Sequence, residues 1–184
     1  MKDNTINPWK IRAERVAYKN PWITIRECDV IRPDGKPGIY GIVDTRIATG
    51  VIAVTPENEI FLVGQYRLPV NVYSWEIIEG GSDSGESPME AAKRELHEEA
   101  GITAALWQQL GGEVHLSNCH SSEVGYFFIA EHLTYSEATP DETELLAIKK
   151  VPFKSALVMV DSGEIQDAMS IIAILRASRH PRFQ

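Results

Sequence analysis

Residues 80–102 restrict the fold of this chain more than any other stretch, because they combine a glycine-rich turn with both ends of a helix. Ser87, Pro88 and Glu90 mark the helix start. Serine is a good capping residue, proline suits the first helical position, and a glutamate three residues after the serine completes a capping box. Gly101 favours the left-handed conformation that ends many helices. The sequence therefore predicts a helix that begins at Pro88 and ends at Gly101.

This predicted helix carries a cluster of carboxylates. Glu95, Glu98 and Glu99 are spaced i, i+3 and i+4, so they share one stripe of the surface, and Glu86 lies just before the helix. Carboxylates this close repel one another at pH 7, so a cation is expected among them. Oxygen-only ligands suit hard divalent ions, which favours Mg²⁺, with Mn²⁺ as a substitute, over Zn²⁺. Arg94, four residues before Glu98, is placed to hold that carboxylate.

The alternative for such a charge run is an ordinary solvated helix face. The spacing is much more specific than that: Gly80, five residues, Glu86, seven residues, and then Arg-Glu-Leu-x-Glu-Glu-x-Gly-Ile from Arg94 to Ile102. With every fixed position filled, this stretch resembles the signature of the Nudix hydrolases, and is called the box below. The resemblance implies an α/β/α sandwich with a mixed β-sheet, and the hydrolysis of phosphorus-containing anhydrides.

The order of the predicted elements agrees with this fold. The apolar run at 50–55 suits a strand that is buried on both faces. Further strands are predicted at 60–67, 75–79, 107–116, 124–133 and 145–151, and further helices at 152–160 and 164–178. This order of strands and helices predicts a mixed sheet between helices.

An antiparallel β extension is expected ahead of this domain. Residues 16–32 are strand-like, 33–37 have turn chemistry, and 39–45 form a second strand, which together predict a hairpin. The chain of 184 residues is long enough for one domain with a small extension. We therefore divide it into an extension, 1–46, and a Nudix domain, 47–184. The extension suits either a packed edge of the same domain or a subunit-interface arm, and the resemblance to the ADP-sugar branch of the family favours an arm at the interface of a homodimer.

Charge and hydropathy narrow the classes of partner. A net charge of −8 disfavours a nucleic-acid surface, which needs basic patches. No apolar run approaches a membrane span and the N-terminus has no signal-peptide core, so we expect a cytoplasmic protein without a membrane partner. A metal ion among the carboxylates would reverse the local field and let an anionic diphosphate approach.

The expected metal ligands are Glu95 and Glu99, one helical turn apart, with Glu98 in the same cluster. The resemblance adds the backbone carbonyl of Glu79, just before the box glycine. Glu98 and Arg94 are also expected to take part in catalysis.

The resemblance further implies a catalytic base from a loop after the box. Glu142 is the first candidate and Glu144 the second, because both lie in an acidic stretch between Pro140 and a predicted strand. Glu123 lies in another loop, where relatives contact the phosphates or the metals. The alternative for the acidic stretch is a solvated loop that only keeps the protein soluble.

Residues 65–69, Gln-Tyr-Arg-Leu-Pro, resemble an element of the ADP-sugar branch in which the arginine meets the diphosphate. The planar guanidinium of Arg67 suits that role, and the alternative is a surface arginine at a strand end. Glu76 occupies the position of the glutamate in that branch's Glu-x-Pro-x-Gly strand and would accept hydrogen bonds from the sugar or base. Ile78 replaces the proline of that strand, which makes the local strand path less certain.

Two aromatic residues of the extension, Trp22 and Tyr18, are candidates for stacking on a base across a dimer interface, although either also suits a core position. Family members specialised for ADP-ribose carry a proline beyond the box, and residues 114–119 contain none. A broader nucleoside diphosphate sugar hydrolase is therefore expected, with ADP-ribose as the first substrate and GDP-mannose and related sugars next.

Three alternatives stay open. The first is a dinucleoside polyphosphate or nucleoside triphosphate pyrophosphatase. The second is a non-catalytic Nudix-fold sensor of nucleotide sugars. The third, a calcium-stabilised structural helix, fits poorly because the carboxylates lie along a helix face and not in a loop that wraps an ion.

Overall fold

The computed structural model describes residues 6–138 and 145–184, and the chain divides into two compact units. The first unit is Met1–Arg46 with Ser117–Glu123, and the second is Ile47–Leu116 with Val124–Gln184. The loop 117–123 was not expected in the first unit. It joins that unit through the backbone of Val43, whose N–H donates to the carbonyl of His120 (2.8 Å) and whose carbonyl accepts from the N–H of Ser122 (3.0 Å).

The first unit is built on an antiparallel sheet in the order β1-β2-β3. Its strands are β1 Lys10–Lys19, β2 Thr24–Ile31 and β3 Pro37–Asp44. The prediction of one strand-like segment over 16–32 is wrong, because Asn20 turns the chain between β1 and β2. Its side-chain oxygen accepts from the backbone N–H groups of Trp22 (2.9 Å) and Ile23 (2.8 Å), as in an Asx-turn. The Asn-Pro pair at 20 and 21 was the signal for this turn.

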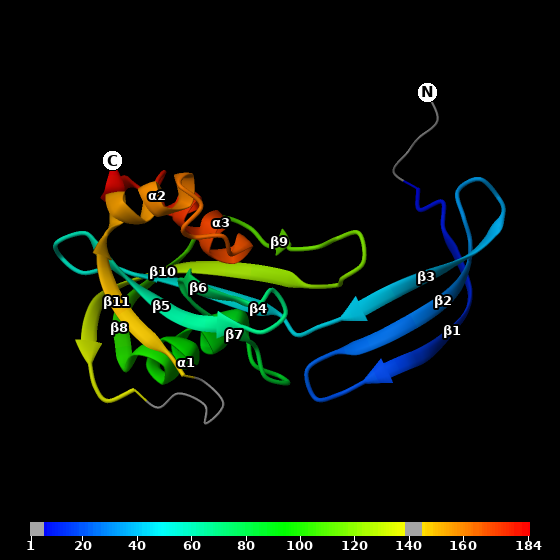
Figure 1. The fold of residues 1–184 in the computed structure, drawn as a ribbon, viewed down its shortest axis with the longest axis horizontal. Coiled ribbons are helices and arrows are strands. Elements are labelled where there is room, and N and C mark those ends of the chain that lie inside the picture. The colour runs from blue at the N-terminus through cyan, green and yellow to red at the C-terminus, as the bar shows by residue number, and fades with distance from the viewer. Residues whose placement is uncertain (1–5, 139–144) are drawn as a thin grey trace. The chain divides into compact units, whose positions relative to one another are not determined.

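The second unit contains two sheets, one in the order β7-β4-β10-β8 with β9 paired to β10, the other in the order β11-β5-β6 (Figure 1). Their strands are β4 Ala48–Ala53, β5 Glu59–Arg67, β6 Val72–Glu76, β7 Ile78–Gly81, β8 Ile102–Gln109, β9 Val114–His115, β10 Val124–Tyr135 and β11 Ala147–Pro152. Strands β4 and β10 run parallel, whereas β4 and β7 run antiparallel. The sheet is therefore mixed, as predicted.

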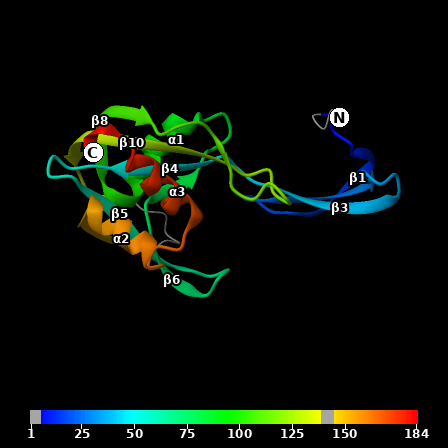
Figure 2. The same ribbon diagram turned by 90° about the horizontal axis from the view of Figure 1, so that it is seen from above.

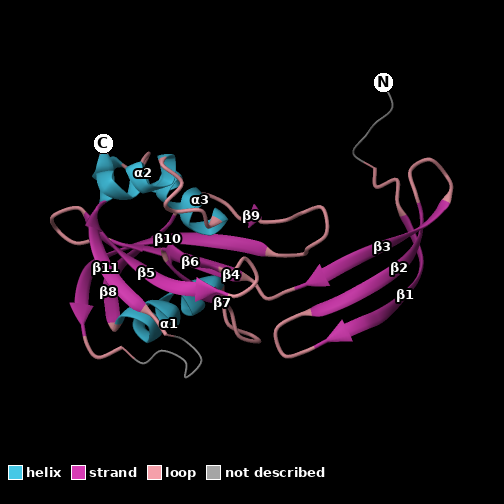
Figure 3. Cartoon of the chain, in the orientation of Figure 1, coloured by secondary structure: helices cyan, strands magenta, loops and turns pink. Residues whose placement is uncertain are grey.

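Helices cover both sides of these strands. They are α1 Pro88–Ala100, α2 Phe153–Asp161, α3 Ala168–Ala177 and the short 3-10 helix η1 Pro181–Phe183. In the second unit, α1 lies on one side of the strands, and α2 and α3 lie on the other (Figure 1 and Figure 3). This confirms the predicted α/β/α arrangement. Within residues 6–138 and 145–184, no helix is long and apolar enough to cross a membrane.

Strand β4 explains why helices are needed on both sides. All its residues are buried, and successive side chains of a strand point to opposite faces. Val51 packs in a cluster with Leu96 of α1, whereas Ile52 packs in a second cluster with Ile174 of α3. Each face of β4 is thus closed by its own apolar layer, which fixes α1 and α3 relative to the strands that carry the site.

The strand predicted at 75–79 is two strands. Strand β6 ends at Glu76 and β7 starts at Ile78, and the two belong to different sheets. Between them, Ile77 leaves the ladder and donates its N–H to the hydroxyl of Ser170 (2.9 Å) in α3. The tip of the β5–β6 hairpin stands clear of the rest of the second unit (Figure 2).

Two other boundaries also differ from the predictions. The strand expected at 107–116 is replaced by β8, which already starts at Ile102, and by the short β9, with Gly111 at a positive φ of 76° between them. The last helix was expected to start at residue 164. It starts four residues later because Asp167 caps it, its side chain accepting from the N–H of Ser170 (2.6 Å).

Candidate active site

Helix α1 begins and ends as the sequence predicts. The Ser87 hydroxyl accepts from the N–H of Glu90 (3.3 Å), and the Glu90 carboxylate accepts from the N–H of Ser87 (2.9 Å), which completes the capping box. Gly101 adopts the left-handed conformation with φ 64°. The predicted extent of the helix that carries the box glutamates is thus confirmed.

Strand β7 approaches α1 so closely that any side chain at position 80 would displace the Glu95 carboxylate. A Cβ atom there would lie 2.1 Å from both Cδ and Oε1 of Glu95. The carboxylate of Glu95 therefore rests directly against the backbone of Gly80. This contact gives a physical reason for the box glycine and places one carboxylate at the junction of strand and helix.

Arg94 gathers three carboxylates of the box. Its guanidinium donates to Glu95 Oε1 (2.8 Å), to Glu98 Oε2 (2.9 Å) and to both oxygens of Glu86 (3.1 and 3.0 Å). It also donates to the carbonyl of Gly81 (2.9 Å), which ties the cluster to β7. The hydrogen bonds from Arg94 are the largest influence on Glu86 and lower the pKa of that carboxyl.

Glu99 differs from the other glutamates of α1. Its residue is 2% exposed, and its Oε2 accepts from the backbone N–H of Glu79 (3.2 Å). The side chains of Glu95 and Glu98 are 14% and 39% exposed. Glu99 thus joins α1 to β7 from inside, while Glu95 and Glu98 lie nearer to solvent.

Arg67, at the end of β5, forms a second cluster. Its Nε lies 3.0 Å from each carboxylate oxygen of Glu76, and its Nη2 lies 2.6 Å from Oε2 of the same residue. Nη2 also donates to Glu79 Oε1 (3.1 Å). Glu76 is only 2% exposed, so Arg67 is anchored to a buried carboxylate and is not a plain surface arginine. We expected Glu76 to bind the sugar or base, whereas here Arg67 occupies its oxygens.

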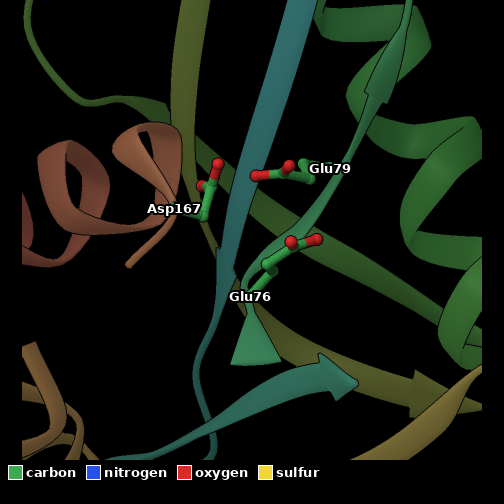
Figure 4. A group of neighbouring side chains, drawn as sticks. All are labelled: Glu76, Glu79 and Asp167. Atoms are coloured by element: carbon green, nitrogen blue, oxygen red, sulfur yellow. The ribbon is translucent and has the colours of Figure 1, made fainter. Parts of the chain in front are cut away.

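Glu76, Glu79 and Asp167 bring one oxygen each to within 4.8 Å of one another (Figure 4). From the sequence, only the backbone of Glu79 was expected at the site, and Asp167 was not among the candidates. The signal for Asp167 was its place directly before the apolar helical run at 168–177, which is typical of a helix N-cap. In the described parts of the chain, no other group of three or more His, Cys, Asp or Glu residues meets this distance.

The charges of this second cluster influence one another. Burial raises the pKa of Glu79 well above its usual range, and the neighbouring Asp167 and Glu76 carboxylates raise it further. The positive charge of Arg67 opposes this effect but does not outweigh it. Burial alone would lower the pKa of Arg67, but the hydrogen bond and charge of Glu76 raise it, so Arg67 is positively charged.

Five predicted site residues are not among the contacts described above. Glu142 and Glu144 fall outside the described residues. Tyr18, at the end of β1, Trp22, in the turn after it, and Glu123 all belong to the first unit. Tyr18 is 53% and Trp22 68% exposed, so neither fills a core position in the described structure. The N–H of Glu123 donates to the Ser121 hydroxyl (3.1 Å). The roles of these five residues stay predictions.

The box carboxylates fit a hard divalent cation. They offer only oxygen atoms as ligands. The positively charged guanidinium of Arg94 already lies among Glu86, Glu95 and Glu98, which shows that this cluster attracts positive charge. The close approach of Glu95 to Gly80 also brings a carboxylate to the backbone of β7 next to Glu79, whose carbonyl is the other predicted ligand.

Sequence comparison identifies two domains. The model of the NUDIX domain matches residues 44–170, and that of the nucleoside diphosphate sugar hydrolase N-terminal domain matches residues 9–43.

Three relatives that match most of this chain have different names. An ADP-ribose pyrophosphatase of Bacillus subtilis (strain 168) is 36% identical over 148 residues, which cover 79% of this chain and 80% of the relative. A methanol dehydrogenase activator of Bacillus methanolicus is 30% identical over 166 residues, 89% of each chain. A GDP-mannose pyrophosphatase of Yersinia enterocolitica is 30% identical over 142 residues, 72% of this chain and 73% of the relative.

One solved structure, described as an ADP compounds hydrolase, has the same fold. It superposes with a TM-score of 0.83 at 21% sequence identity and covers 94% of each chain. The likeness extends over nearly the whole length of both proteins.

Proposed function

The chain belongs to the Nudix hydrolase family and carries the N-terminal domain of nucleoside diphosphate sugar hydrolases, and on this premise we propose that it hydrolyses the diphosphate bond of nucleoside diphosphate sugars with Mg²⁺. At the coarser level it is a hydrolase similar to ADP-ribose and GDP-mannose pyrophosphatases. ADP-ribose is the first proposed substrate, and GDP-mannose and related sugars are the next. The products are a nucleoside monophosphate and a sugar phosphate.

The observation that carries the proposal is the gathering of Glu86, Glu95 and Glu98 around Arg94, next to the backbone of Gly80. Arg94 supplies one positive charge to three carboxylates, and a divalent cation would balance the rest, which a sensor that only binds its ligand does not need. Mg²⁺, or Mn²⁺ in its place, would be held by Glu95, Glu98, Glu99 and the backbone carbonyl of Glu79.

When bound, the metal supplies charge neutralisation for the diphosphate oxygens and a more acidic water. The chain's own residues do the rest. Glu99 holds β7 against α1 through the N–H of Glu79, which keeps the ligands of the strand and the helix in register. Arg67 is held through Nε and Nη2 by Glu76 and Glu79, and its guanidinium, 38% exposed, presents its remaining donors to a phosphate oxygen. Glu142 is the proposed base that accepts a proton from the attacking water, with Glu144 as the second candidate.

The test is product release from a panel of nucleoside diphosphate sugars, dinucleotides and triphosphates with Mg²⁺. A coupled phosphatase that attacks only the products reports turnover as inorganic phosphate. ADP-ribose and GDP-mannose should be turned over, and excess chelator should stop the reaction. Preference for triphosphates or dinucleoside polyphosphates would favour the first alternative. Tight binding of a nucleotide sugar that stays intact with Mg²⁺ would favour the sensor and overturn the proposal.

The domain and assembly predictions are part of the same proposal. We propose that residues 1–46 act as a dimerisation arm of a cytoplasmic homodimer, with Trp22, Tyr18 and Glu123 as candidate substrate contacts. The match of the N-terminal domain model to residues 9–43 supports a distinct role for this segment. Sedimentation of the full chain measures the assembly directly, and a monomer at micromolar concentration would contradict the arm.

A further inference from the structure

We propose that Glu76, Glu79 and Asp167 form a second cation site, separate from the carboxylates gathered by Arg94, which takes a hard divalent ion such as Ca²⁺. The three residues come from the end of β6, from β7 and from the residue that caps α3. An ion there would join two adjoining strands to the start of a helix. The site adjoins the proposed hydrolase site, because the backbone of Glu79 and the side chain of Arg67 belong to both, but its occupancy can be measured without turnover.

The first observation is an unsatisfied oxygen. The side chain of Glu79 is 8% exposed, and its Oε2 is fully buried without a hydrogen-bond partner in the described structure. Its Oε1 accepts from Arg67 at 3.1 Å, so the carboxylate is held in place by one oxygen while the other is open. A buried carboxylate oxygen without a partner is costly, and such groups are normally paired or bound to a metal.

The second observation is the balance of charge. Three carboxylates meet here, and Arg67 supplies one positive charge. That guanidinium bonds both oxygens of Glu76, while one oxygen of Asp167 accepts from the N–H of Ser170 at 2.6 Å. A divalent cation would balance the negative charge that Arg67 leaves.

The third observation concerns the type of ion. The three candidate ligand atoms lie within 4.8 Å of one another, close enough for one ion to contact all three. All three are carboxylate oxygens, which hard divalent ions prefer, and Ca²⁺ accepts such ligands in flexible geometry. Ca²⁺ is therefore the ion with which the site is tested.

Figure 4 shows how the fold forms the site: Asp167 faces Glu76 and Glu79 from the loop before α3. The arrangement depends on the break between β6 and β7, since Ile77 there bonds Ser170 on the first turn of the same helix. The hydrogen bond from Ile77 N–H to Ser170 thus fixes α3 against the two strands, which holds the three carboxylates together before any ion binds.

The experiment counts Ca²⁺ ions bound per chain at saturation, by equilibrium dialysis and by calorimetry, in the wild type and in Asp167→Asn. Asparagine is as good a helix cap as aspartate, so α3 should keep its start while the site loses a charged ligand. Asp161→Asn, an exposed position at the end of α2, is the matched control for charge. Thermal melting in chelator checks that each variant is folded.

We expect Asp167→Asn to bind one Ca²⁺ fewer per chain than the wild type and Asp161→Asn to bind the same number. The loss should persist when Glu95→Gln removes a box ligand, because the two substitutions affect different ions. If Asp167→Asn is unfolded, Glu79→Gln replaces it, since that change keeps the backbone carbonyl and N–H of residue 79. An unchanged Ca²⁺ count in the folded variant overturns the proposal, and a proton shared by Glu79 and Asp167 then explains the cluster.

Discussion

Replacement of Gly80 with alanine tests directly whether the position of the Glu95 carboxylate determines activity. The added Cβ would lie 2.1 Å from Cδ and Oε1 of Glu95, against 3.4–4 Å for ordinary van der Waals contact. The carboxylate therefore has to move by about 1.3 Å or more. The backbone is not the obstacle, because Gly80 is not among the residues with positive φ. The atoms in the way are the flexible end of a side chain, so the fold should survive.

A displacement of this size is large for a metal ligand. Misplacement of a reacting group by about 1 Å costs on the order of 100-fold in rate, which corresponds to about 2.7 kcal/mol of transition-state stabilisation. We therefore expect Gly80→Ala to lower kcat for ADP-ribose about 100-fold, with a higher Mg²⁺ concentration needed for half-maximal activity. The melting temperature should change little in comparison.

The matched control is Gly112→Ala, since a Cβ at Gly112 meets no atom within 4 Å and this glycine also lacks a positive φ. Its kcat should equal that of the wild type. Steady-state kinetics over a range of Mg²⁺ concentrations and a thermal melt are sufficient for both variants. Full activity of folded Gly80→Ala at limiting Mg²⁺ would contradict this prediction, because catalysis would then not require the Glu95 carboxylate in the position that the structure shows.

Further predictions concern the supports of the site. Ser170→Ala should lower the free energy of unfolding by about 1–3 kcal/mol in urea titrations, because it leaves the buried N–H of Ile77 without its acceptor. Arg94→Lys should cost about 1–2 kcal/mol by the same measurement, since an ammonium cannot bridge three carboxylates as the guanidinium does. Glu79 has a raised pKa in the native state, so in chelator it keeps its proton at pH values above 4.5, where the unfolded chain has lost it. The free energy of unfolding should therefore fall as the pH rises above 4.5, and Glu79→Gln should make that fall smaller. Glu142→Gln should lower kcat far more than it raises KM, and a normal rate would move the base to another carboxylate.

The local features of the box could be predicted because they depend on residues close in sequence. The capping box of Ser87 and Glu90 and the left-handed Gly101 follow from single residue types and their spacing. The family, the mixed sheet and the helices on both of its sides could likewise be inferred from the order of patterns. The Asx-turn at Asn20 is equally local, but it was not predicted because the residues on both sides of it are typical of a strand.

The second carboxylate cluster could not be predicted in this way. Asp167 is far from Glu76 and Glu79 along the chain, and its side chain alone indicates only a helix cap. The three carboxylates meet because β6 and β7 separate into different sheets at Ile77, and the N–H of Ile77 then bonds Ser170 of α3. The break carries no turn signal in the sequence, because residues 76–78 are Glu-Ile-Ile and none of them is a typical turn residue.

The family, the helix that carries the box glutamates and the chemical type of ligand they offer could all be inferred from the amino-acid sequence. Those properties depend on spacing along one helix, where geometry repeats regularly. The folded chain was needed to see which carboxylate each arginine holds, that Glu99 bonds the backbone of Glu79, and that Asp167 lies beside Glu76. These contacts join residues from different elements, and their positions depend on how sheets and helices pack, which no local pattern encodes.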